Sequence, residues 1–135
     1  MWFYEGKEFT EEMLDGYIGF VYIITNLVDL RQYVGKKLFT AARTKMVKGK
    51  KKRTRVASDW MKYYGSNEEL KADVKRQGPD FFRREILHLC KSKGECNYLE
   101  VKEQCVRGVL EMDQFYNQWI AVKVHKAHLK NLCQK

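Results

Sequence analysis

Two short apolar segments of this chain each carry a tyrosine, and a polar stretch separates them. The first reads Gly19-Phe20-Val21-Tyr22, and eleven positions after Tyr22 the second begins, Tyr33-Val34-Gly35-Lys36-Lys37. A tyrosine hydroxyl can both donate and accept a hydrogen bond, and ammonium groups attract phosphate oxygens. The two segments therefore predict chemistry on a phosphate backbone.

Both segments are typical of the paired strands of a β-hairpin. Residues 19–25 are rich in β-branched and aromatic side chains, which favours a buried strand. Residues 26–30 are expected to form the turn, and residues 32–36 the returning strand. A third strand is expected over residues 81–89, whose second half alternates in polarity.

Two helices are expected to flank these strands. Ser66 and Glu69 have capping-box spacing, and Gly78-Pro79 would stop the helix that follows. Asn97 would start a second helix running to about Met112. The resulting fold class is α+β: a small three-stranded antiparallel sheet flanked by helices, with residues 116–120 closing the core.

One domain is the simplest organisation for 135 residues. We expect a motif region over about residues 19–120, followed by a basic and helical tail at 121–135. The N-terminal residues 1–17 are polar and aromatic, and we expect one short helical turn in them, near residues 11–14.

The formal net charge of +9 favours a polyanionic partner. Residues 30–58 contain no acidic side chain, and we interpret them as a loop or hairpin insertion that follows phosphates. A solvated loop or a localisation tract is the alternative. The nucleic-acid-binding residues that we expect are Lys36, Lys37, Lys45, Lys50, Lys51, Lys52, Arg53 and Arg55.

Membrane insertion and export are not expected. No apolar run is long enough to cross a bilayer, and the first residues lack the features of a signal peptide. A cytoplasmic location follows, where the four cysteines would be free thiols. Their spacings match no zinc or redox motif.

The two tyrosine segments resemble the two halves of the GIY-YIG nuclease signature. Val21 stands where the first half has isoleucine, and Gly19 lies one position further upstream than in the signature. The tracts at residues 58–66 and 98–102 are similar to phage-encoded, homing-type members of this superfamily. The resemblance spans about residues 19–120.

The resemblance implies roles for five residues. Tyr22 would be the general base that activates water, and Tyr33 would orient the water or the phosphate. Arg43 would stabilise the pentavalent phosphate, Glu100 would bind Mg²⁺ or Mn²⁺, and Asn117 would hydrogen-bond the phosphate or fix a neighbouring side chain.

Alternatives remain open for several of these roles. Arg53 or Arg55 could replace Arg43, and Glu103 is the alternative to Glu100 as metal ligand. Lys36 and Lys37 could polarise the phosphate, or lower the pKa of the general base, which for a phenol is normally near 10. Ordinary strand packing is the structural alternative for both tyrosines.

The expected function is that of a metal-dependent DNA endonuclease, acting as a homodimer or in two binding events when both strands are cut. A catalytically inactive nucleic-acid-binding module of the same fold is one alternative. A small basic RNA-binding protein is the other.

Overall fold

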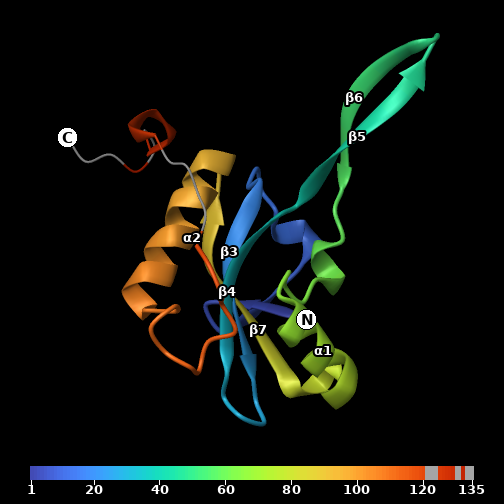
Figure 1. Cartoon of the computed structure of the whole chain (residues 1–135). Coiled ribbons are helices and arrows are strands. Elements are labelled where there is room, and N and C mark those ends of the chain that lie inside the picture. The colour runs from blue at the N-terminus through green and yellow to red at the C-terminus, as the bar shows by residue number, and fades with distance from the viewer. Residues whose placement is uncertain (121–124, 130–131, 133–135) are drawn as a thin grey trace.

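The computed structural model describes residues 1–120, 125–129 and 132. Its main sheet has five strands in the order β2-β1-β7-β3-β4, and a separate two-stranded hairpin follows β4 in the chain (Figure 1). The strands are β1 Trp2–Tyr4, β2 Lys7–Phe9, β3 Gly19–Asn26, β4 Gln32–Leu38, β5 Thr40–Val47, β6 Lys50–Ala57 and β7 Phe82–Cys90, and the α-helices are α1 Glu68–Gln77 and α2 Lys93–Arg107.

The α+β class is confirmed, but the three-stranded antiparallel sheet is wrong. Strands β7, β3 and β4 form the expected antiparallel centre. Strands β1 and β2 extend the sheet beyond β7, and β1 pairs with β7 in parallel. Each of these two strands has three residues, which is too short for a readable period. Their turn, Glu5-Gly6, has positive φ at both residues, as tight two-residue hairpins require.

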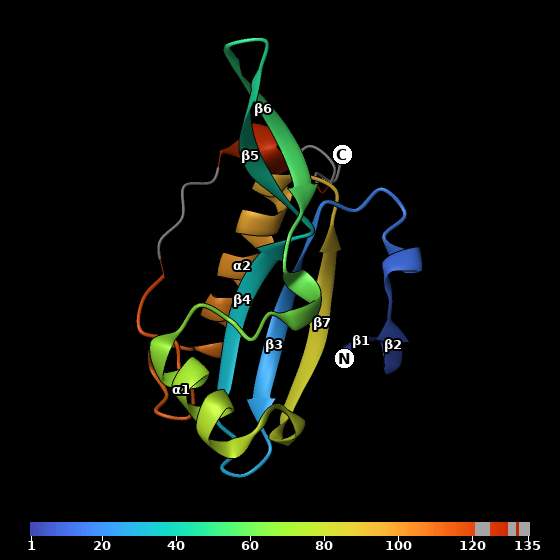
Figure 2. The same cartoon turned by 90° about the vertical axis from the view of Figure 1, so that its right-hand side faces the viewer.

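Strand β3 is buried on both faces, which explains its nearly continuous apolar sequence. Phe20, Tyr22 and Ile24 pack into a cluster with Trp2, Trp60, Leu70 and Tyr116. Val21 and Ile23 face the other way, into a cluster with Leu99 of α2. The sheet therefore lies between α2 on one side and α1 with the 3-10 turn Trp60–Lys62 on the other (Figure 2).

Both helices begin at a cap that differs from the expected one. Asn67, not Ser66, caps α1, and its side chain accepts a hydrogen bond from Leu70 N. Ser92 caps α2 five residues before Asn97, and Gly108, with φ of 63°, ends it. Several cap-competent residues lie close together at both sites, and only the folded chain selects one of them.

Residues 114–117 close the outer edge of β4. Gln32 N donates to Gln114 O, and Tyr116 N donates to Gln32 O. Two residues further along, Asn117 accepts from Val34 N at 3.0 Å and donates to Val34 O at 2.9 Å. An edge strand that would expose unpaired backbone groups is thereby covered.

The acid-free stretch forms a hairpin that projects from the sheet (Figure 1). Its turn, Lys48-Gly49, again has positive φ at both residues. The expected hairpin insertion is therefore confirmed. The other segments are the 3-10 turns Glu11–Met13, Pro79–Phe81 and Lys126–Leu129. The rest of the expected helical tail, residues 121–124, 130–131 and 133–135, lies outside the described residues.

No helix among the described residues is both long and apolar enough to span a membrane. Cys90 and Cys96 are buried free thiols, and Cys105 is an exposed one, whereas Cys133 lies outside the described residues.

We predict that Asn117→Ala lowers the free energy of unfolding by about 1–3 kcal/mol, because it leaves the buried Val34 N–H without a partner. The neighbouring Gln118→Ala is the control, since Gln118 is exposed and its change should stay within about 0.5 kcal/mol. Urea unfolding followed by circular dichroism measures both. Equal losses in the two variants would contradict the edge-closing role of Asn117.

Candidate active site

Tyr22 lies at an irregularity in the sheet. The register between β3 and β7 shifts between Val21 and Tyr22, because Leu87 is an extra residue in β7. Directly across β4, Gly35 pairs with Tyr22. A Cβ at position 35 would lie 2.5 Å from the Tyr22 hydroxyl oxygen, so only glycine lets the phenol pass over β4 toward its outer edge.

The Tyr22 hydroxyl is surrounded by other phenols. The Tyr22 ring centroid lies 6.2 Å from that of Tyr33 and 6.0 Å from that of Tyr63. Burial, followed by the effects of Tyr63, Tyr33 and Glu100, raises the pKa of Tyr22 well above its usual value. Tyr22 therefore keeps its proton at neutral pH. The sequence had suggested that nearby lysines would lower the pKa of Tyr22, but they do not.

Tyr33 is half-buried and reaches the surface beside Ser66, with 3.0 Å between the two hydroxyl oxygens. Burial raises the pKa of Tyr33 too, against the opposing effect of the Ser66 hydrogen bond. Tyr33 and Ser66 line a small cavity together with Glu100, Gln104, Trp119 and Ile120. Tyr33, rather than Tyr22, is thus the phenol in contact with this cavity.

Glu100 comes from α2, on the opposite face of the sheet, and reaches the outer edge of β4. Burial raises the pKa of Glu100, and the positive charge and backbone of Lys36 partly oppose that effect. A bound cation would stabilise the charged form of a carboxylate that has so few favourable partners.

Glu103 occupies a different environment. It lies 2.7 Å from His88 and 3.0 Å from Arg107. Partial burial acts to raise the pKa of Glu103, but the hydrogen bonds with His88 and Arg107 outweigh it and lower the pKa. The structure therefore brings Glu100, and not Glu103, together with the tyrosines.

A divalent cation fits the oxygen donors at Glu100. No group of three or more His, Cys, Asp or Glu side chains that could enclose a metal occurs in the described part of the chain. Mg²⁺ does not require one, since it keeps several waters and takes one or two carboxylates together with phosphate oxygens. Glu100, opening into a cavity beside two hydroxyl groups, provides one such ligand.

Arg43 lies away from the tyrosines in the folded chain. It lies in the exposed strand β5, opposite Thr54, on the projecting hairpin. Lys45, Lys50, Lys51, Lys52 and Arg53 are exposed on the same hairpin. Arg55 folds back at its base and donates to Thr40 Oγ1 at 2.7 Å.

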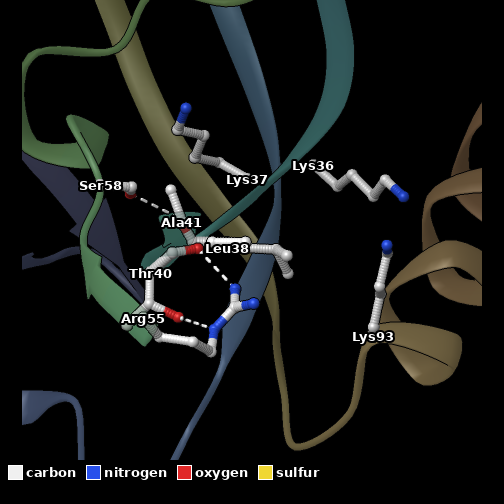
Figure 3. A pocket seen from close by; sticks show the side chains of 9 residues that line it. Lys36, Lys37, Leu38, Thr40, Ala41, Arg55, Ser58 and Lys93 are labelled. Carbon is white, nitrogen blue, oxygen red and sulfur yellow. Dashed lines mark hydrogen bonds between the residues drawn. The ribbon is translucent and has the colours of Figure 1, made fainter. Parts of the chain in front are cut away.

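A cationic groove separates the base of the hairpin from α2. It is lined by Lys36, Lys37, Arg55 and Lys93, among others. Lys36 and Lys93 extend toward one another across it, whereas Lys37 extends to the other side of β4 (Figure 3). There Lys37 lies 4.1 Å above the Tyr63 ring centroid and 2.7 Å from Asp59.

Sequence reasoning missed Ser66, Lys93 and Arg84. Arg84 is buried and donates to the carbonyl oxygens of Met61 and Tyr63, which holds Tyr63 against Tyr22. Arg84 lies in a strand whose sequence alternates in polarity, and that pattern does not indicate such a role.

Trp119 was expected in the core, and this is wrong: 75 % of it is exposed, whereas Trp2 and Trp60 are 1 % and 2 % exposed. The apolar composition of residues 116–120 indicated burial, but the segment leaves β4 after Asn117. Trp119 thus stands at the rim of the cavity that holds Glu100.

Residues 2–120 match the family model described as "Putative endonuclease segE, GIY-YIG domain". Neither the curated proteins nor the solved structures gave a match. The matched span includes all five sheet strands, both α-helices and the hairpin.

We predict that Gly35→Ala destabilises the protein by about 1–3 kcal/mol, because the new methyl group would overlap Tyr22 and Tyr33. Thermal unfolding measures the loss. The double variant Gly35→Ala/Tyr22→Phe should recover part of it, since it removes the oxygen nearest to the methyl group. If the double variant is less stable than Gly35→Ala alone, the close approach of the Tyr22 hydroxyl is not the cause.

Proposed function

The chain belongs to the GIY-YIG endonuclease domain family, and on that premise we propose that it is a metal-dependent endonuclease that hydrolyses phosphodiester bonds in DNA. The observation that carries the proposal is the convergence of Tyr22, Tyr33 and Glu100 at the outer edge of β4. They come from three separate elements, and strand packing alone does not require them to meet.

The phenols have different tasks in this proposal. Tyr33 contacts the cavity and orients the attacking water through its hydroxyl. Tyr22 takes up the proton that the water loses, in the fraction of molecules whose Tyr22 has already released its own proton to solvent. The raised pKa of Tyr22 makes its anion scarce at neutral pH but strongly basic once it forms.

Glu100 holds the divalent cation, which when bound supplies charge stabilisation to the phosphate and a more acidic water. Lys36 is hydrogen-bonded to Asn97 next to it, where its ammonium group neutralises charge on the scissile phosphate. Asn117 acts through the backbone: both polar atoms of its amide bind Val34, so it fixes the strand that carries Tyr33 and Gly35.

The arginine that stabilises the phosphate is more simply assigned to Arg55 than to Arg43. Arg55 lines the groove that also contains Lys36 and Lys93. Its hydrogen bonds to Thr40 keep the guanidinium at the base of the hairpin. A planar guanidinium suits the bidentate recognition of phosphate.

A binding module that does not cut is the second candidate, and one observation favours it. Burial that raises the pKa of Tyr22 opposes its use as a base, and 1 % exposure leaves its side chain little contact with water. This candidate predicts salt-sensitive DNA binding with no cleavage at any metal concentration.

We predict that the protein nicks supercoiled plasmid DNA only when Mg²⁺ or Mn²⁺ is added, and that Glu100→Gln lowers the rate at least about 100-fold, by the loss of metal-ion catalysis. Glu103→Gln is the matched control, because it removes the same charge from a residue that lies one helical turn from Glu100 and pairs with His88 and Arg107 instead. Equal rates in wild type and Glu100→Gln would refute the assignment of Glu100.

Metal binding has a readout that does not depend on cleavage. Trp2 and Trp60 are buried, so quenching of tryptophan fluorescence by Mn²⁺ reports mainly on Trp119 at the cavity rim. We expect saturable quenching in wild type and Glu103→Gln, and none in Glu100→Gln. Saturable quenching that survives in Glu100→Gln would place the cation on other ligands.

We predict that the cleavage rate at saturating metal rises close to tenfold per pH unit between about pH 7 and 9. Below its raised pKa, the fraction of Tyr22 without its proton grows tenfold per unit, and this increase shows no plateau in that range. Tyr22→Phe should lower the rate and flatten the profile. The same slope in Tyr22→Phe would assign the titrating proton to another group.

A further inference from the structure

The hairpin carries exposed cations on both of its faces. Residues directly opposite one another in an antiparallel pair share a face, and the register pairs Ala42 with Arg55 and Arg43 with Thr54. Following this alternation, face one carries Lys51, Arg53 and Arg55, and face two carries Arg43, Lys45, Lys50 and Lys52.

These cations lack acidic partners in the part of the chain that the structure describes. None of the ion pairs found in the described residues includes a hairpin side chain, and residues 30–58 contain no acid. Lys45 even pairs directly with Lys52, and like charges opposite one another destabilise a ribbon. The ribbon is therefore complementary to an external polyanion.

The two-sided charge distinguishes between ways of binding that polyanion. A ribbon lying flat on a nucleic acid would need cations on one face only. A ribbon inserted between two walls of phosphate needs them on both. Of the grooves in nucleic acids, the major groove of B-form DNA, about 12 Å wide, admits a two-stranded β-ribbon.

We propose that β5 and β6 insert into the major groove of B-form duplex DNA, with each face binding the phosphates of one groove wall. The inference rests on the proposed function, and it gives the substrate class: B-form duplex, in preference to single strands or double-stranded RNA. The deep and narrow major groove of A-form RNA excludes protein elements of this kind.

The ribbon's dimensions agree with this arrangement. Eight residues per strand at about 3.3 Å each span about 26 Å, or about eight base pairs of 3.4 Å. Lys51, Arg53 and Arg55 on face one lead down to the groove that Lys36 and Lys93 line. DNA held by the ribbon would therefore continue past the tyrosine cluster.

The test measures binding alone, on the Glu100→Gln background so that no DNA is cut. One variant carries Lys51→Gln, Arg53→Gln and Arg55→Gln, and the other carries Arg43→Gln, Lys45→Gln and Lys52→Gln. A control removes three exposed lysines from other elements, Lys7→Gln, Lys71→Gln and Lys75→Gln. Fluorescence anisotropy gives Kd for a 20-base-pair DNA duplex, its single strand and the matching RNA duplex at several salt concentrations.

We expect each face variant to bind duplex DNA at least tenfold more weakly than the control. The slope of log K against log salt should fall by up to about 2.7 in each, at 0.9 per phosphate contact. The unmutated ribbon should bind the DNA duplex more tightly than the single strand or the RNA duplex.

Loss of binding from one face variant only would overturn groove insertion in favour of a ribbon lying on the surface. Equal or tighter binding of the RNA duplex would overturn the substrate class. Failure of the proposed function is separable from both results. If the protein never cuts DNA but both face variants lose binding, the proposal that the ribbon enters the major groove still holds.

Discussion

The outer edge of β4 is the constraint on which the site depends. Its outward N–H groups at residues 32, 34 and 36 all need partners, because an open edge would pair with other chains. Gln114 O accepts from the first and the Asn117 amide from the second, and the Glu100 carboxylate lies close to the backbone at the third. The carboxylate proposed to bind the metal thus lies beside the tyrosines at the same edge that Gln114 and Asn117 close.

The same edge explains why Gly35 and Tyr22 belong together. A phenol that starts in the middle of the sheet can reach this edge only by crossing β4, and only a residue without Cβ leaves it room. The crossing has an electrostatic consequence: the hydroxyl is buried among other phenols, and its pKa rises. The geometry therefore favours a catalytic role for Tyr22, whereas its environment opposes the charged phenolate. Which of these two effects dominates decides whether the protein is a nuclease or a binding module.

What the sequence could predict was what local patterns encode. The β3–β4 hairpin and the tyrosines it carries follow from apolar periodicity, and the basic insertion follows from composition. The three-residue strands β1 and β2 have no period to detect, and their pairing with β7 links residues about 80 positions apart. Trp119 looked like a core residue because composition cannot show where a segment leaves a strand.

Arg43 shows the same limit at the level of the site. Its separation from Tyr33 matches an arginine on a helix, but here the chain continues as strand β5, and ten residues of strand reach about twice as far as ten residues of helix. On a helix, this separation would place the guanidinium of Arg43 near the tyrosines, but in strand β5 it places the guanidinium out along the ribbon. Arg55, on the returning strand β6, comes back to the base of the hairpin. An insertion can thus move a functional group to a new position in the chain, because reach depends on the conformation of the residues between and not on their number.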